Sequence, residues 1–227
     1  MKRSILLLGA VFGAVALLTT GAVAADGNGT KTWRVTIRNL TPSGPGAPGS
    51  QPLSPPLFVV HSKAVDVWSV GGIASHPVAA IAEDANNAPA ESALGKLAGV
   101  RTVFTGAGGP IPSGTARTFT IQTRGKFNRL TIVSMLVNTN DAFTGLDSVQ
   151  VRGKRSQLSR NAYDAGSERN NELKAFIPGP CCGNAFARDP EGALIGPHQG
   201  ITGVGDLDPA VYGWKGPVAQ ITIERVS

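Results

Sequence analysis

The chain has 227 residues, with 21 lysines and arginines against 15 aspartates and glutamates, 29 glycines, 16 prolines and 2 cysteines. This length allows one sizeable core or at most two small ones. The basic residues behind the net charge of +6 are scattered and form no stripe with interleaved aromatics, so nucleic acid is a poor candidate partner. We expect one soluble domain.

The first 24 residues have the layout of a secretory signal peptide. Two basic residues precede an apolar run from Ile5 to Leu18, and small residues follow up to Ala24, as in an A-x-A cleavage site. A retained membrane anchor is disfavoured because the apolar core is shorter than the about 20 residues that span a bilayer. We therefore expect a signal peptide at 1–24, a flexible leader at 25–30 and one secreted or periplasmic domain at 31–227, with no transmembrane segment after cleavage.

Alternation of apolar and polar residues predicts several strands. In residues 32–40, Trp33, Val35 and Ile37 occupy one side and polar residues occupy the other, which is typical of a half-buried strand. Similar or more continuously apolar patterns predict strands at 57–62, 117–123, 128–137, 146–153 and 218–226, with weaker pieces at 64–70 and 172–176.

Residues 75–100 differ from the rest because they are rich in alanine and place Val78, Ile81 and Ala82 at helical spacing. This pattern predicts two short helices, broken around Asn87 and Pro89.

Two long stretches rich in glycine and proline, at 41–56 and 177–217, predict loops of a length that is unusual unless the loop is functional or disordered. Many short strands, few helices and abundant turn residues indicate an all-β fold. We predict an antiparallel β-sandwich of about eight strands with a short helical excursion and long Gly/Pro-rich loops.

The two cysteines, Cys181 and Cys182, are adjacent. Adjacent cysteines join only in a small strained ring, outside the usual Cα separation of about 5.5 Å. We predict such a vicinal bridge in an oxidising compartment, where it stiffens its loop; two free thiols or a bridge to another molecule are the alternatives.

The sequence contains no recognisable catalytic motif. His61, His76 and His198 have no partner at metal-binding spacing, so structural or surface roles are favoured. Ser54 and His61 form a conceivable nucleophile and base pair, but no GxSxG, HExxH or catalytic-cysteine context accompanies them. We predict that the protein is not an enzyme.

Acidic residues form two groups worth attention. Asp141 and Asp147 flank AFTGL, and Asp164 and Glu168 lie four apart in YDAGSERNN. Calcium takes about six to eight oxygen ligands, which loops at strand ends can supply. Neither group has the EF-hand order, so spacing alone favours solvated loop acids.

A resemblance to a known family shifts the balance from solvated loop acids toward calcium ligands. The segments SPPLFVVHS, SMLVNTNDAFTGLDS, YDAGSE and VAQITIERV occur in the order found in the spondin N-terminal domain family, known from F-spondin, mindin and many bacterial secreted proteins. The chain resembles this family from about residue 31 to residue 227. The resemblance implies an eight-stranded antiparallel β-sandwich, similar to calcium-dependent membrane-binding sandwiches. Animal members bind one calcium ion through acids of the second and third segments.

Carried over residue by residue, the resemblance implies that Asp141, Asp164 and Glu168 bind Ca²⁺. Glu168 stands where animal members usually have the shorter aspartate, and its longer side chain can still reach an ion. On this hypothesis the ion joins the loop after the LTIVSMLV strand to the DAGSE loop.

Three other acids are secondary candidates. Asp147 is expected to turn the loop near Asp141 or to support it by hydrogen bonds. Glu83 and Asp84, in the expected helical segment, are disfavoured as ligands.

The resemblance favours an exported, non-catalytic binding or adhesion module that presents loops at one end. Its extracellular ligand is a protein, a carbohydrate or a lipid headgroup, among which the sequence does not choose. The alternatives are an exported hydrolase that uses the same metal or Ser54 and His61, and an envelope component that assembles with copies of itself through edge strands.

Overall fold

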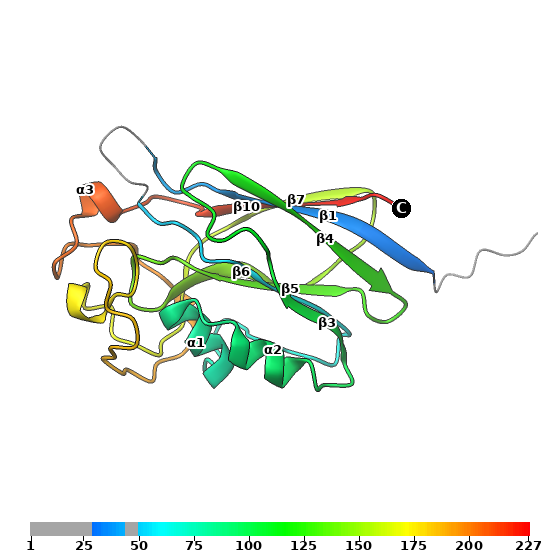
Figure 1. The fold of residues 1–227 in the computed structure, drawn as a ribbon, viewed down its shortest axis with the longest axis horizontal. Coiled ribbons are helices and arrows are strands. Elements are labelled where there is room, and N and C mark those ends of the chain that lie inside the picture. Colours follow the sequence, from blue (N-terminus) through cyan, green and yellow to red (C-terminus); the bar gives the residue numbers. More distant parts are fainter. Residues whose placement is uncertain (1–28, 44–49) are drawn as a thin grey trace, which may run out of the picture.

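The computed structural model describes residues 29–43 and 50–227. In this part of the chain, ten strands form two antiparallel sheets that face each other (Figure 1). One sheet has the order β4-β1-β10-β7, with β1 at Thr30–Asn39, β4 at Ala116–Arg124, β7 at Arg155–Arg160 and β10 at Ala219–Arg225. The other has the order β3-β2-β5-β6-β8-β9, with β2 at Leu57–His61, β3 at Val100–Thr105, β5 at Arg129–Met135, β6 at Ala142–Gln150, β8 at Tyr163–Asp164 and β9 at Gly196–Pro197. The predicted β-sandwich is confirmed.

The four-stranded sheet is organised around β1, which pairs with β10 on one side and β4 on the other. Its alternating pattern buries Trp33, Val35 and Ile37 between the sheets, as predicted, and leaves the intervening arginines exposed. Val35 lies opposite Ile223 of β10 and Phe119 of β4. The first described strand is therefore fixed by strands far away in the sequence.

The six-stranded sheet is covered on both faces, which explains the continuous apolar run of β2. Phe58 and Val60 face the core between the sheets, whereas Leu57 and Val59 belong to a second core beneath the helices. All five residues of β2 are buried. A strand enclosed on both sides loses its polar alternation.

Two helices cover the outer face of this sheet (Figure 1), α1 at His76–Asp84 and α2 at Ala88–Leu94. They confirm the predicted helical excursion, and Val78 and Ile81 pack into the second core. Ala85, with a left-handed φ of 57°, ends α1. Pro89 lies in the first turn of α2 instead of breaking the helix, because a proline needs no N–H donor there.

Several local predictions were wrong. Residues 64–70 form turns and not a strand, although Trp68 is buried against Phe143. Residues 172–176 contain only the 3-10 turn η1 (Lys174–Phe176). Strands β3 and β7 were missed because none of their residues is fully buried, which gives a weak apolar pattern. A short helix, α3 (Pro209–Tyr212), lies in the long C-terminal loop.

Some predicted segments fall wholly or partly outside the described residues. The signal peptide and most of the leader belong to residues 1–28, and part of the first long loop belongs to residues 44–49. β1 begins at Thr30, one residue before the expected domain boundary. In the remainder of that loop, Leu53 is buried and bridges to Ile111 and Leu136.

No helix among the described residues has the length and apolar character needed to cross a membrane.

Gly145 in β6 provides a test of the sheet packing. A Cβ atom at this position would lie 1.8 Å from the carbonyl oxygen of Ile132. We expect Gly145→Ala to lower the free energy of unfolding by about 3 kcal/mol, at the upper end of ordinary overpacking, since backbone must move. Gly196→Ala is the control, because its nearest contact is 3.8 Å. Equal melting temperatures for the two variants would contradict this close packing.

Candidate metal centre

The carboxylate of Asp141 joins the connection between β5 and β6 to the DAGSE segment. Asp141 precedes β6 directly and its side chain is fully buried. Its Oδ2 atom accepts hydrogen bonds from the backbone N–H of Ser167 at 2.8 Å, from the Ser167 hydroxyl at 3.1 Å and from the backbone N–H of Glu168 at 2.9 Å. The structure thus brings together the two acidic segments that the sequence singled out.

Asp164 lies beside this contact because β8 pairs with β6, which places Asp164 opposite Ala142. Its Oδ1 accepts from the N–H of Gly166 and its Oδ2 accepts from the Asn170 amide, both at 2.6 Å. Gly166 has φ +68°, and a Cβ there would meet the Ala193 carbonyl oxygen at 2.5 Å. Asp164 therefore shapes a turn that requires glycine.

Glu168 is the most isolated of the three predicted acids. It is 1% exposed, and neither of its carboxylate oxygens accepts a hydrogen bond from a described residue. The Nε of Arg188 lies 3.5 Å from Oε1, an ion-pair contact without hydrogen-bond geometry. Arg188 binds two other acids more closely, Glu83 at 2.6 Å and Asp84.

The loop that carries Arg188 is held against the DAGSE segment by backbone hydrogen bonds. The N–H of Ala193 donates to Gly166 and the N–H of Glu191 donates to Ser167. This pairing positions Arg188 between α1 and Glu168. Glu83 and Asp84, disfavoured as ligands from the sequence, therefore lie in the same charged cluster as Glu168.

Burial leaves this cluster short of positive charge. Desolvation, reinforced by the nearby Asp164 charge, raises the pKa of Asp141 to about 7, although its hydrogen bonds to Glu168 and Ser167 oppose the shift. Desolvation also raises the pKa of Glu168 to about 8; Arg188 opposes this shift, and Glu83 and Asp141 add to it. One arginine does not compensate the acids around it.

The unpartnered atoms of the cluster fit a hard cation. Three buried oxygens have no hydrogen-bond donor among the described residues: Oδ1 of Asp141 and both carboxylate oxygens of Glu168. Such oxygens are the ligands that calcium prefers. The described side chains do not already form a cage of three or more acidic, histidine or cysteine ligands. Both oxygens of Asp164 accept hydrogen bonds, from Gly166 and Asn170.

Asp147 does not have the role expected from its spacing. The AFTGL segment is part of strand β6 and not a loop, and Asp147 lies farther along that strand with an exposed side chain. Its pKa is raised by partial burial and by Asp66. Asp147 therefore neither turns the Asp141 loop nor supports Asp141.

Ser54 and His61 do not form a catalytic pair. Ser54 accepts a hydrogen bond from the N–H of Met135, whereas His61 lies opposite Arg129 at the other end of β5. The His61 ring contacts the Ser62 carbonyl and the Thr131 hydroxyl. Both residues are buried and serve the sheet structure, as predicted for the histidine.

Glu172, which no sequence pattern singled out, attaches the C-terminal loop to this end of the molecule. Its carboxylate accepts four hydrogen bonds, from the backbone N–H groups of Thr202, Gly203 and Val204 and from the Thr202 hydroxyl. Its own N–H donates to the Asn140 side chain, next to Asp141. An acid in the polar run RNNE carries no sequence signal for such a role.

A second missed feature is the hydrogen-bonded chain that supports Asp164. His198 accepts from the N–H of Gly200 at Nδ1, and its pKa is lowered by burial. The neutral ring therefore carries its proton on Nε2 and donates it to Asn170 Oδ1 at 2.9 Å. The Asn170 amide in turn donates to Asp164.

The predicted vicinal disulfide is present between Cys181 and Cys182. Its loop packs on the connection that leads to Asp141, since the N–H of Cys181 donates to the Asn138 side chain. A Cβ on Gly179 would lie 2.0 Å from the Val137 carbonyl oxygen. The two loops therefore approach each other through glycine.

Removal of the Glu172 carboxylate tests the loop attachment. Glu172→Ala leaves four donors without their acceptor, so we expect the free energy of unfolding to fall by about 2 kcal/mol. Glu191→Ala, at an exposed acid, is the control and should change stability little. Chemical denaturation measures both, and equal midpoints would argue against the role of Glu172.

The raised pKa values of Asp141 and Glu168 predict a pH dependence for chelator-treated protein. Between about pH 4 and pH 8 the folded state holds protons that the unfolded state has lost, so stability falls as pH rises. From pH 6.5 to 8.5 we expect a loss of about 2 kcal/mol, or roughly 5 °C in melting temperature. Asp141→Asn should make this profile shallower, because the contribution of Glu168 remains, and Asp147→Asn should leave it unchanged. A wild-type melting temperature that rises over this range would contradict the burial of charge-deficient acids.

Comparison with known proteins gives a family match. A family model described as Spondin_N matches residues 48–169, just over half of the chain. The matched segment includes Asp141, Asp164 and Glu168. No curated protein matches the chain.

Proposed function

Because the protein belongs to the spondin N-terminal domain family, we propose that it is an exported, calcium-stabilised binding module. Modules of this family are non-enzymatic and typically extracellular. Its loops at the end that contains Asp141 present the ligand-binding surface. It acts by binding and not by catalysis.

The observation that carries the calcium proposal is the set of unpartnered buried oxygens on Asp141 and Glu168. These two residues would hold the ion, with Asp164 contributing its charge from the adjacent turn. Calcium, when bound, supplies the positive charge that these buried carboxylates lack. The contact between Asp141 and Glu168 itself orients the DAGSE turn against the start of β6, because the Asp141 carboxylate accepts a hydrogen bond from the backbone N–H of Glu168.

The loop surface offers two different cavities, each bordered by one acid of the cluster, which supports a binding role. A polar cavity of about 190 Å³ is lined by Asp164, Asn170, Glu172 and His198, among others. An apolar cavity of about 520 Å³ borders Asp84 and is lined largely by prolines, with Met135 and Val137. Specific ligand sites commonly combine such apolar walls with a few fixed polar groups.

The loops around these cavities are held in place by contacts across long sequence distances. The segment from residue 163 to residue 217 gathers at the end of the sandwich away from the C-terminus (Figure 1). Glu172, Arg188 and the vicinal disulfide each attach part of this segment to another loop or to α1. A fixed loop surface binds a partner with less loss of conformational entropy.

The calcium proposal predicts a ligand-dependent melting temperature. At a calcium concentration 100 times the dissociation constant, binding adds about 2.7 kcal/mol to stability. We therefore expect a rise of roughly 5–10 °C in calcium relative to chelator, because 1 kcal/mol corresponds to about 2–4 °C at this size.

Asp141→Asn keeps the shape of the side chain and should abolish the calcium response. Asp147→Asn makes the same chemical change on the exposed part of β6 and should leave the response intact. Differential scanning calorimetry separates these results. Identical wild-type melting temperatures in calcium and in chelator would refute the calcium site, as would a full response in Asp141→Asn.

A further inference from the structure

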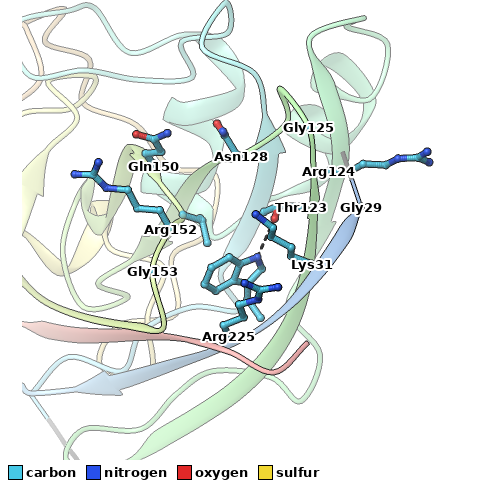
Figure 2. Close-up of a pocket in the computed structure, with 12 residues that line it drawn as sticks. Gly29, Lys31, Thr123, Arg124, Gly125, Asn128, Gln150, Arg152, Gly153 and Arg225 are labelled. Carbon is cyan, nitrogen blue, oxygen red and sulfur yellow. Dashed lines mark hydrogen bonds between the residues drawn. The ribbon is translucent and has the colours of Figure 1, made fainter. Parts of the chain in front are cut away.

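A basic pocket (Figure 2) lies at the other end of β6 from the candidate metal centre. Strand β6 connects the two sites, since Ala142 follows Asp141 and Gln150 lines the pocket. At about 3.3 Å per residue, the two ends of this strand are some 25–30 Å apart. The pocket has a volume of about 250 Å³. Because of the distance along β6, it is separate from the acidic cluster.

Four cationic side chains line this pocket, Lys31, Arg124, Arg152 and Arg225, and no acidic side chain of residues 29–43 or 50–227 does. Within the described residues, none of the four has a carboxylate within 4.0 Å. Glu224, the sequence neighbour of Arg225, is occupied by Arg34 at 3.5 Å and Arg155 at 3.3 Å. In the part of the chain that the structure describes, the cations of the pocket thus have no ion-pair partner.

The remaining polar groups of the pocket include several hydrogen-bond donors. The indole N–H of Trp33 donates to the Thr123 hydroxyl oxygen at 2.8 Å, which leaves the hydroxyl hydrogen free to donate in turn. The amides of Asn128 and Gln150 also line the pocket. Cations surrounded by neutral polar groups suit an oxyanion that is attached to a hydroxyl-bearing carrier.

The basic surface continues around the turn between β4 and β5. A second, open cavity of about 510 Å³ is lined by Arg101, Arg124, Lys126 and Phe127, with Gly125 between them. Arg124 lines both cavities and extends away from Lys31 and Arg225 in Figure 2. A ligand with repeated negative charges can therefore contact both cavities, whereas a single free ion cannot.

We propose that this end of the protein binds an anionic sugar chain through its sulfate or phosphate groups. Lys31 and Arg225 hold one such group in the pocket, whereas Arg152 and Arg124 extend away from this pair on opposite sides (Figure 2) and contact further groups of the chain. The polar lining offers no apolar wall for an acyl chain. Trp33 is only 2% exposed, so its ring is not available to stack on a nucleic-acid base.

The test is a calorimetric titration with a short, fully sulfated oligosaccharide. We expect binding that weakens as salt increases, because exposed charges are screened. The double variant Lys31→Glu/Arg225→Glu should weaken binding at least tenfold. The control, Lys174→Glu/Lys215→Glu, makes the same change in net charge at exposed lysines outside both basic cavities and should stay within about threefold of the wild type.

Parallel titrations show which kind of molecule carries the negative groups that the pocket binds. The unsulfated oligosaccharide, inorganic sulfate and inorganic phosphate should each bind at least tenfold more weakly than the sulfated oligosaccharide. Tighter binding of anionic phospholipid vesicles or of single-stranded DNA would overturn the assignment to a sugar chain. No binding of the sulfated oligosaccharide, or equal losses in the two double variants, would overturn the pocket itself.

The test of the basic pocket and the test of the calcium site can fail independently of each other. Lys31 and Arg225 are exposed and lie far from Asp141, so their double variant should keep the wild-type melting temperature within a few degrees and the same response to calcium. If the melting temperature of this double variant falls strongly, the single variant Arg152→Glu is used for the oligosaccharide titration instead, with Lys174→Glu as its control.

Discussion

The buried carboxylate of Asp141 connects the start of β6 to the backbone of Ser167 and Glu168, and the position of the DAGSE turn depends on this contact. A buried carboxylate must be hydrogen-bonded or compensated by positive charge. Asp141 meets this requirement at one oxygen only, while the other faces an environment shared with Glu168 and Asp164. The contact therefore orders the turn and at the same time leaves an electrostatic deficit that a divalent cation would remove.

The β-sandwich supplies the rigid frame that makes this deficit possible. Phe143 and Ala142 follow Asp141 on opposite faces of β6, one under the helices and one between the sheets. Because both faces are covered, Asp141 cannot move toward water without loss of packing on each side. The surrounding loops are in turn attached by polar contacts, such as those of Glu172, and not by a large core of their own.

Charge is distributed unevenly along the long axis of the sandwich. The loop end buries acids together with Arg188, whereas at the other end Lys31, Arg124, Arg152 and Arg225 form no ion pair with another described residue. An even scatter of basic residues in the sequence thus becomes a concentrated positive surface in the fold. The two ends are suited to ligands of opposite charge, a cation at one and an anionic chain at the other.

The sequence by itself determined the sandwich, the helical segment and the pair of acidic segments, because strand alternation, helical spacing and a family pattern are local signals. The edge strands β3 and β7, whose exposed residues weaken the alternation, were not predictable in this way. Only the tertiary structure decided that Arg188 reaches Glu83, Asp84 and Glu168, that Asp147 stands apart, and that scattered cations converge on one pocket. Such contacts join residues far apart in the chain, and their distances are set by strand register and loop packing, which no local pattern contains.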